Sequence, residues 1–324
     1  MKVTILCMVA ACSALLANVA SASSFPQKSV KIVVPFSAGG SGDVVARLLG
    51  KHLGERWGRQ VVIENIPGAA GQIGRSAVVR SEPDGYTLLL ADESVLVIAP
   101  QMQGGKDVQP LEGMRPITPV ANIDFVLSVS SSSGIRNMKA FVEQGKKEKR
   151  LSYGSAGVGS IHNLIMEHLA DLLGLSLMHV PYKGTAQVFT DVVSNEVTAV
   201  YSGIPQARSF IDAGKIVPLA IGSAQAHPAL PGVPTISSEL GMDFDGTAVW
   251  YITAPQKTPD SVISQIHSDI RSILDDPAYR DAIHSAGLSP ADSKTDAKAE
   301  LLSKWTRWRS VIDARGLWPQ GAAK

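Results

Sequence analysis

The sequence predicts an α/β protein of two domains, each built on a mostly parallel β-sheet flanked by helices. Apolar runs with the character of strands alternate with helix-patterned stretches along the chain, which is typical of βαβ units on a parallel sheet. Two glycine-rich turns of one design, at residues 34–43 and 153–160, each join such a strand to such a helix. This duplication predicts two domains that hold one small anion between them.

The elements follow from hydrophobic periodicity and turn residues. Apolar residues with a period near 3.6 indicate helices, and short apolar runs indicate strands. Proline and glycine clusters mark the boundaries, and the proline-rich segment 104–119 is expected to be irregular. The expected strands are 30–36, 61–63, 86–91, 121–129, 151–153, 177–181, 197–201, 217–221 and 249–253, and the expected helices are 43–57, 73–80, 138–148, 161–173, 188–195, 259–274, 277–285 and 296–314.

The order of these elements predicts how the chain divides. We expect domain 1 to comprise residues 23–123 and 248–324, and domain 2 to comprise residues 124–247. A hinge is then expected near 122–125 and 246–250, where the chain passes between the domains.

Residues 1–22 have the features of a cleaved secretory signal. Lys2 is followed by an apolar stretch and by Ala20-Ser21-Ala22, an A-x-A cleavage pattern. Cys12 offers an alternative, a lipoprotein signal, which we disfavour because the apolar region before it would be very short. Both cysteines, Cys7 and Cys12, lie in this segment, so the mature chain is expected to have no disulfide and no thiolate site. No later segment has the length and hydrophobicity of a membrane span.

Composition and charge exclude further classes. The chain of 324 residues is 18% charged, with a formal net charge of +1 at pH 7. It has no basic stripe with interleaved aromatic residues, which argues against nucleic-acid binding. It also has no HExxH motif, no Walker phosphate loop and no complete dinucleotide fingerprint, so we expect no metal and no cofactor. Without a coiled coil or a large apolar face, we expect a monomer.

The two glycine turns are candidate anion sites. Each one ends at a helix N-terminus, where backbone N–H groups have no intrahelical partner and the helix dipole is positive. Such a terminus binds anions readily, without the desolvation cost of a buried lysine or arginine. Glycine is needed in the turn because a Cβ would block close approach or a positive φ.

Five segments in order resemble one family, the substrate-binding receptors of tripartite tricarboxylate transporters, often named Bug receptors. The segments are VPFSAGGSGDVVARLL at 34–49, VIENIPGAAGQIG at 62–74, EPDGYTLLL at 82–90, YGSAGVGSIHNL at 153–164 and HVPYKG at 179–184. The resemblance implies a periplasmic two-domain Venus-flytrap fold. It also implies a receptor that captures a small carboxylate, passes it to membrane transporter subunits and catalyses no reaction.

The resemblance also implies which residues contact the ligand. The two turns would pinch a carboxylate, largely through main-chain amides and bridging waters. The residues that match the family's pattern are Phe36, Ser37, Ala38, Gly39 and Gly40 in the first turn and Ser155, Gly159 and Ser160 in the second.

This chain departs from the family pattern at two positions that bear on the ligand. Gly42 replaces the usual serine or threonine before the helix aspartate, so a hydroxyl contact is lost there or is taken over by Ser41. Ser202-Gly203 follows the strand 197–201 where the family often has an aspartate. An acidic residue there could pair with a ligand amine, so its absence argues mildly against amino-acid ligands.

Other candidate site residues have structural alternatives. Asp43 is interpreted as a helix cap more than as a ligand contact, whereas His162 is equally compatible with lining the site and with a structural hydrogen bond. Packing of the core or hinge is the favoured role for Trp250, and a strand-end turn is nearly as good an explanation of Tyr182 and Lys183 as cleft lining. The remaining candidates are Asn65 and Gly68, which would shape a third loop of the cleft, and Ser94 and Ser202, which would contribute to specificity.

The sequence leaves two other functions and the ligand open. A secreted hydrolase would need a nucleophile beside a base, and Ser160 with His162 is the one pair available, although their side chains diverge at a helix start. A sensor partner would bind the same ligand but present it to a signalling protein. Dicarboxylates, tricarboxylates and aromatic carboxylates all fit a site made of main-chain amides.

Overall fold

The computed structural model describes residues 25–104, 108–148, 151–182 and 184–318. The predicted signal segment 1–22 with Cys12, and Lys183, lie outside the described residues. None of the helices in the described part of the chain is both long and apolar enough to cross a membrane.

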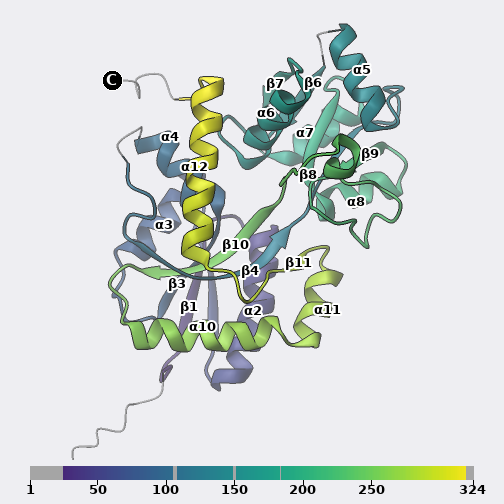
Figure 1. Ribbon diagram of the computed structural model, residues 1–324. Helices are drawn as coiled ribbons and strands as arrows, with labels where there is room; N and C mark the ends of the chain where they lie inside the picture. The colour runs from purple at the N-terminus through teal and green to yellow at the C-terminus, as the bar shows by residue number, and fades with distance from the viewer. Residues whose placement is uncertain (1–24, 105–107, 149–150, 183, 319–324) are drawn as a thin grey trace, which may run out of the picture.

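Two mixed β-sheets organise the molecule (Figure 1). The first has the order β11-β4-β10-β3-β1-β2 and the second the order β7-β6-β8-β5-β9. β1 pairs in parallel with β2 and β3, and β6 with β7 and β8, while β10 and β5 run antiparallel to their neighbours. The strands are β1 (Val30–Val34), β2 (Val61–Asn65), β3 (Thr87–Asp92), β4 (Met114–Ile123), β5 (Phe125–Ser130), β6 (Ser152–Ser155), β7 (Met178–Pro181), β8 (Ala199–Gly203), β9 (Ile216–Ile221), β10 (Ala248–Pro255) and β11 (Ser289–Pro290). The predicted α/β class is confirmed.

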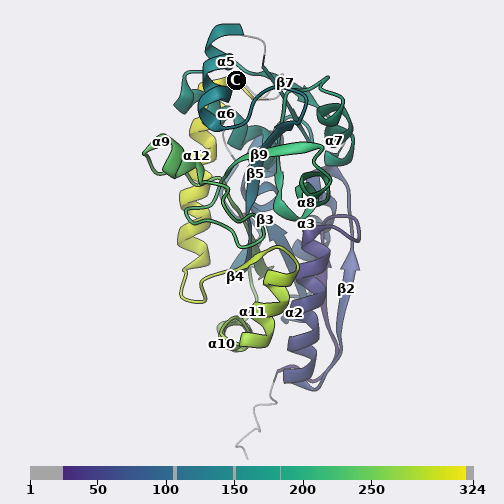
Figure 2. The same cartoon turned by 90° about the vertical axis from the view of Figure 1, so that its right-hand side faces the viewer.

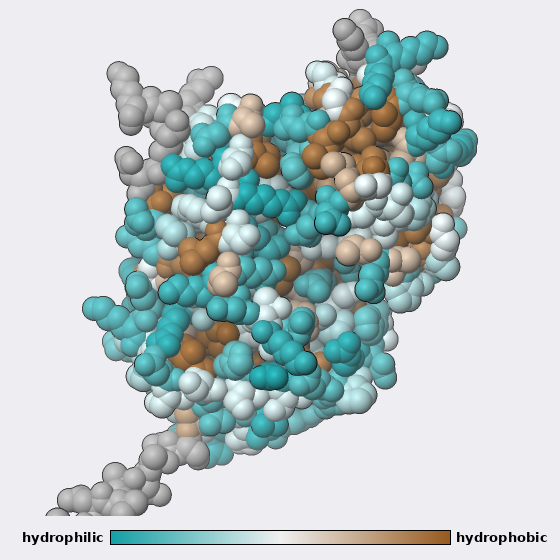
Figure 3. Space-filling view, in the orientation of Figure 1, coloured by the Kyte–Doolittle hydropathy of each residue, from teal (hydrophilic) through white to brown (hydrophobic). Residues whose placement is uncertain are grey.

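Helices flank both sheets. In Figures 1 and 2, α2, α10 and α11 lie along the first sheet, while α5 to α8 surround the second. Most of the face in Figure 3 is hydrophilic, and hydrophobic groups gather toward the end that holds α5 and α6. The helices are α2 (Ser41–Trp57), α3 (Gln72–Val79), α4 (Ala99–Gly104), α5 (Met138–Glu148), α6 (Ile161–Leu173), α7 (Thr185–Val193), α8 (Ile204–Asp212), α9 (Ile236–Leu240), α10 (Asp260–Leu274), α11 (Pro277–Ser285) and α12 (Ala297–Arg315), with short helical turns η1 (Ala69–Gly71) and η2 (Ser94–Ile98). The bounds predicted for α5, α6 and α11 are confirmed.

The expected single strand 121–129 is wrong, because the chain changes sheets within it. β4 ends at Ile123 in the first sheet and β5 begins at Phe125 in the second. Asp124 holds the crossing point: Ser289 Oγ donates to its Oδ2 at 2.7 Å, and Ile204 N donates to its carbonyl oxygen at 2.9 Å. Both strands are buried, and apolar residues continue at alternate positions on both sides of Asp124, so the pattern resembles one strand and hides the break.

The expected irregular segment 104–119 is also wrong in part, because β4 begins at Met114. Its prolines, Pro116 and Pro119, pair with β10 at places where the register shifts. A sheet tolerates proline, which has no N–H to donate to the neighbouring strand, at such irregularities. The sequence pattern does not predict η1, η2, α4, α8, α9 or β11.

The strands of each sheet come from separate parts of the chain. The first sheet uses strands within 30–123 and 248–290, and the second uses strands within 125–221. We therefore keep 23–123 with 248–324, and 124–247, as the proposed domains.

α12 fixes the segment that follows β3 to the rest of the protein. Fully buried Glu93 accepts hydrogen bonds from Lys304 Nζ at 3.2 Å and from Trp308 Nε1 at 2.8 Å. Burial alone would lower the pKa of Lys304, but the carboxylates of Glu93, Asp245 and Glu300 outweigh burial and raise it. α12 therefore holds a buried charge pair directly beyond the end of β3.

We predict that Lys304→Met lowers the free energy of unfolding by about 3–5 kcal/mol, because it leaves the Glu93 carboxylate buried without its cation. Urea unfolding of the ligand-free protein measures this loss. Lys31→Met is the matched control, since it breaks the exposed Lys31–Glu64 pair and should cost at most about 1 kcal/mol. Equal losses in the two variants would contradict a structural role for the buried pair.

Candidate functional site

A cavity of about 180 Å³ lies between the N-termini of α2 and α6. Larger surface hollows exist, such as one of about 640 Å³ along α2 and β2, but that hollow lies away from both helix N-termini. The cavity is lined by Phe36, Gly40, Ser41, Gly42, Asp92, Ile123, Phe125, Ile161, His162, Gln206 and Trp250. Strands of both sheets, the first candidate turn and the start of α6, which follows the second candidate turn, therefore meet at one site.

The first turn is held by a hydrogen bond from a glycine to the helix. Gly40 is the N-cap of α2, and Gly39 before it has φ of 85°. The N–H of Gly39 donates to Asp43 Oδ2 at 3.0 Å. Asp43, the third residue of the helix, thus accepts from the N–H of the residue before the N-cap, one position earlier than the donor in a capping box.

The second turn repeats this device. Ser160 is the N-cap of α6, and Gly159 before it has φ of 75°. The N–H of Gly159 donates to Asn163 Oδ1 at 2.9 Å. Ser160 Oγ donates to Gly157 O at 2.7 Å and accepts from Asn163 N at 3.3 Å. The two turns, predicted to share a design, share their hydrogen-bond pattern as well.

This pattern decides which amides remain open to the cavity. The N–H groups of Gly39 and Gly159 are engaged by Asp43 and Asn163. In the described part of the chain, no hydrogen bond uses the N–H groups of Ser41 and Gly42 on α2 or of Ile161 and His162 on α6. Because these four residues line the cavity, the positive ends of two helix dipoles converge on it.

Asp43 and Asn65 stabilise the first turn from outside the cavity. Arg47 donates to both oxygens of Asp43, at 2.9 and 3.0 Å. These hydrogen bonds, together with those from Gly39 and Asn65, hold the pKa of the Asp43 carboxyl below its usual range. Asn65 Nδ2 also donates to Phe36 O at 3.1 Å. The predicted role of Asp43 as the helix cap is wrong, because α2 begins two residues earlier and Gly40 is its N-cap; Asp43 instead holds the turn through Gly39.

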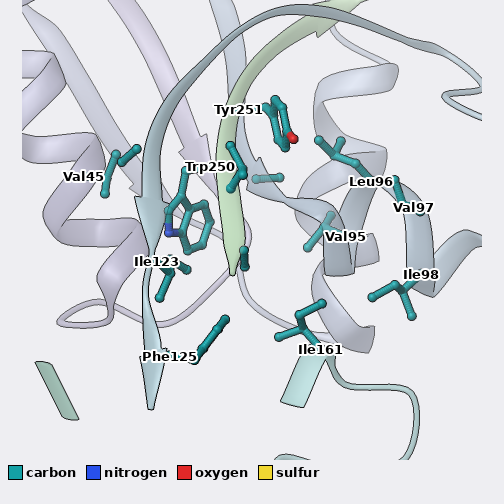
Figure 4. Packing of buried hydrophobic residues seen from close by; sticks show 14 of the residues in the cluster. Val45, Val95, Leu96, Val97, Ile98, Ile123, Phe125, Ile161, Trp250 and Tyr251 are labelled. Carbon is teal, nitrogen blue, oxygen red and sulfur yellow. The ribbon is translucent and has the colours of Figure 1, made fainter. Parts of the chain in front are cut away.

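Aromatic rings form one wall of the cavity. Trp250 on β10 packs edge-to-face on Phe36, with ring centroids 5.6 Å apart. Figure 4 shows Trp250 beside Ile123, on the side of β10 opposite to Tyr251. A Cβ added to Gly42 would lie 2.5 Å from Trp250 Cη2. Gly42 therefore leaves room for the indole, which explains why this chain has glycine where a hydroxyl residue was expected.

His162 lines the opposite wall as a neutral side chain. Its ring meets Phe125 at 5.2 Å, and burial lowers its pKa to about 4. The Nδ1 atom of His162 and the Nε1 atom of Trp250 are buried and have no hydrogen-bond partner within the described residues. Because buried polar atoms are nearly always paired, these two are expected to bind a ligand or water.

The other predicted site residues lie elsewhere or have partners already. Ser37 and Ala38 are exposed on the turn, and Gly68, with φ of 124°, belongs to the neighbouring loop. Ser94 bonds to Asp92, while Ser155 shares a hydrogen bond with His179 Nε2 at 2.7 Å. Tyr182 Oη donates to Asp191 at 2.6 Å. Ser202 is buried on β8, and its Oγ has no partner in the described ranges. A ligand contact by any of these residues stays a prediction.

Asp92 is a lining residue that sequence reasoning missed. It ends β3 and is 6% exposed, and burial raises the pKa of its carboxyl to about 6. The clue was its place at the carboxyl end of a buried strand, where ligands of α/β proteins bind. Gln206 was missed as well, because its helix, α8, was not expected. The described residues contain no cluster of three or more His, Cys, Asp or Glu suited to a metal ion.

Residues 45–317 match the sequence model of a family described as "Tripartite tricarboxylate transporter family receptor". A UPF0065 protein of Bordetella pertussis is 31% identical over 307 residues, which cover 94% of each chain. Protein BugT of the same organism is 29% identical over 300 residues, 91% of this chain and 92% of that protein.

Solved structures resemble the fold over nearly its full length. The R. palustris protein Rpa4515 with adipate has a TM-score of 0.78 and 26% identity, covering 90% of this chain and 98% of its own. The periplasmic binding protein BugD has a TM-score of 0.75 and 27% identity, covering 91% and 99%.

We predict that Gly42→Ser destabilises the protein through a clash with Trp250, at a cost of about 1–3 kcal/mol typical of overpacking. The same substitution in a Trp250→Leu background should cost much less, since the ring is gone. Urea unfolding of the four proteins in this double-mutant cycle tests the contact. Additive losses would show that the indole and Gly42 do not interact.

Substitutions of Asp43 should separate its two contacts. Asp43→Asn keeps an oxygen acceptor for Gly39, as Asn163 does in the other turn, and loses only the charge pair with Arg47. Asp43→Leu loses both and should cost about 1 kcal/mol or more, as for other caps. Because the pKa of Asp43 is lowered in the folded protein, its charge stabilises the protein above about pH 4 and this stabilisation is lost as pH falls.

Unfolding measured at pH 7 and pH 3 tests both statements. The difference between Asp43→Asn and the natural protein should shrink at pH 3, while that of Asp43→Leu should persist. If Asp43→Asn costs as much as Asp43→Leu at pH 7, the hydrogen bond to Gly39 is not what holds the turn.

Proposed function

The chain belongs to the tripartite tricarboxylate transporter receptor family, and from this premise we propose that it is a periplasmic receptor for a small carboxylate. It binds the carboxylate between the N-termini of α2 and α6 and delivers it to a tripartite-type membrane transporter. Members of the family and the structural neighbours are substrate-binding proteins, and this chain is a substrate-binding protein rather than an enzyme.

The convergence of two helix N-termini on one cavity is the observation that carries this proposal. Ser41 and Gly42 on one side and Ile161 and His162 on the other offer unpaired N–H groups. A carboxylate has two oxygens that can accept from both sides at once. None of the described lining residues is a lysine or an arginine, so main-chain dipoles supply the positive potential. The bound adipate of the R. palustris neighbour supports the same class of ligand.

Closure of the two proposed domains follows from this arrangement. A carboxylate that touches both helices binds the closed form better than the open form, and this difference in affinity drives closure. The chain crosses at Asp124 and again before β10. Arg315 at the end of α12 forms ion pairs with Glu167 and Asp171 on α6, at 3.2 and 3.0 Å. These pairs connect the two proposed domains away from the cavity.

The location and the partner belong to the same proposal. The signal-like segment 1–22 would direct the chain to the periplasm. The structural neighbour BugD is likewise described as a periplasmic binding protein. A sensor role remains the alternative, because the same closed form can be presented to a signalling protein. Deletion of the gene distinguishes the roles: loss of uptake supports transport, whereas loss of a response with uptake intact supports sensing.

A hydrolase based on Ser160 and His162 has no support in the geometry. Ser160 Oγ donates to Gly157 O and accepts from Asn163 N, so it caps a helix and contacts no base. Its hydrogen bonds match a structural serine.

Removal of one amide tests the proposed carboxylate site. Ser41 is the first residue of α2, a position that favours proline, and the extended conformation of Gly40 before it suits proline as well. Ser41→Pro therefore deletes one N–H group and keeps the helix. Ser41→Ala is the matched control, because it removes the hydroxyl and keeps the N–H.

The mature protein, refolded free of ligand, is titrated with a panel of mono-, di- and tricarboxylates, and binding is measured by calorimetry or thermal shift. A ligand at about 100 times its Kd adds roughly 2.7 kcal/mol of stability. Ser41→Pro should weaken binding at least about tenfold, the value of one charge-assisted hydrogen bond, and Ser41→Ala should change it little. Unchanged affinity in Ser41→Pro would contradict binding by the amides of α2.

A further inference from the structure

We propose that Asp92 selects the group that the ligand carries opposite its carboxylate, so that the pocket takes a small carboxylate bearing an ammonium or hydroxyl group and excludes a second carboxylate. This inference rests on the proposed carboxylate site, and it names the class of ligand that the site accepts.

The hydrogen bonds of Asp92 leave one of its oxygens free. Oδ1 accepts from the backbone N–H groups of Ser94 and Val95 and from the hydroxyl of Ser94. Within the described ranges no hydrogen bond uses Oδ2, although Asp92 lines the cavity and is only 6% exposed. Capping of η2 accounts for Oδ1, and Oδ2 remains available to a ligand.

The surroundings of Asp92 offer no cation to offset its charge within the cavity. On β10 and α2 the neighbouring lining residues are Trp250 and Gly40 to Gly42, none of which is charged. His162 on α6 is held neutral by burial. Glu93, next in the chain, is paired with Lys304 on the side of α12. An acid in this position is therefore most stable when the ligand supplies the positive charge or the donated proton.

The cavity consequently has two poles of opposite character. The amides of α2 and α6 attract an anion, and the Asp92 carboxylate repels one. A dicarboxylate would bring a second negative charge into the small cavity that Asp92 lines, and like charges in a buried site cost affinity. A zwitterion or a hydroxy acid satisfies both poles. A volume of about 180 Å³ is below that of sites for drug-sized ligands, which suits a ligand with a short carbon chain.

The proposed role of Asp92 also bears on the expectation about amino-acid ligands. The lack of an aspartate after the strand 197–201 argued mildly against them. Under this proposal, Asp92 at the end of β3 supplies the cavity with an acidic group for a ligand amine.

The proposal predicts in which direction the affinity for each ligand changes with pH. Burial raises the pKa of Asp92 to about 6, so the carboxyl is mostly ionised at pH 8 and mostly protonated at pH 5. A ligand ammonium favours the ionised form, and its affinity should fall as pH drops from 8 to 5. A second carboxylate requires the protonated form, and its affinity should rise over the same range.

The experiment compares 4-aminobutyrate, 4-hydroxybutyrate, butyrate and succinate, together with their three-carbon equivalents, on the refolded protein by calorimetry at pH 8 and pH 5. Asp92→Asn is the test variant, since it keeps the Oδ1 acceptor for Ser94 and Val95 and removes the charge. Asp84→Asn is the control. Asp84 is an acid that precedes the other end of β3, and an asparagine there can still accept the hydrogen bond from Tyr86 N.

In the natural protein at pH 8, the amino or hydroxy acid should bind at least about tenfold more tightly than the diacid of equal length. Asp92→Asn should remove this preference and its pH dependence, chiefly by a gain in diacid affinity, while Asp84→Asn should keep both. Without ligand at pH 8, the Asp92→Asn variant should also unfold at a higher temperature than the natural protein, because it removes a charge whose burial is costly. At pH 4 the variant should have no such advantage.

The outcomes separate this inference from the proposed function. Equal or tighter binding of the diacid by the natural protein at pH 8, or a preference unchanged in Asp92→Asn, overturns the role of Asp92 and leaves the carboxylate receptor intact. Binding of no carboxylate in either this set or the wider panel, with folding verified, overturns both.

Discussion

Each side of the cavity depends on a hydrogen bond from a glycine N–H to the side chain four residues later. Asp43 accepts from Gly39 and Asn163 from Gly159. Both glycines have a positive φ, a conformation that other residues rarely adopt. The bond closes the turn outside the helix and leaves the next amides, on the first helical residues, aimed at the cavity. Main-chain donors can then face an anion in a buried site without a charged side chain.

Under the proposed function, the aromatic wall and Asp92 add specificity to a general anion site. Gly42 and Trp250 are coupled, because the indole occupies the space that a side chain at 42 would need. Trp250 and Phe36 narrow the cavity, and Asp92 gives it a negative end. The fold supplies the helix termini, whereas in our proposal these few side chains determine what else the ligand must carry.

Distant segments hold the site in place. Lys304 and Trp308 of α12 bind Glu93, the residue after Asp92, so the C-terminal helix positions the end of β3. The same helix reaches α6 through Arg315. Asp124 joins the two sheets and is itself held by Ser289 and by Ile204 N. Residues far apart in the chain thus define the geometry of a cavity of about 180 Å³.

The sequence by itself determined the α/β class, the bounds of α5, α6 and α11, and the two matching turns, because periodicity and glycine placement are local properties. It also indicated that Asp43 serves the turn. Only the tertiary structure decided that residues 121–129 form two strands in different sheets, since apolar residues alternate in the same way on both sides of Asp124. Asp92 and Gln206 likewise become site residues only through folding: the crossings of the chain bring the end of β3 and the start of α8 to the same cavity as α2 and α6, and no local pattern encodes that meeting.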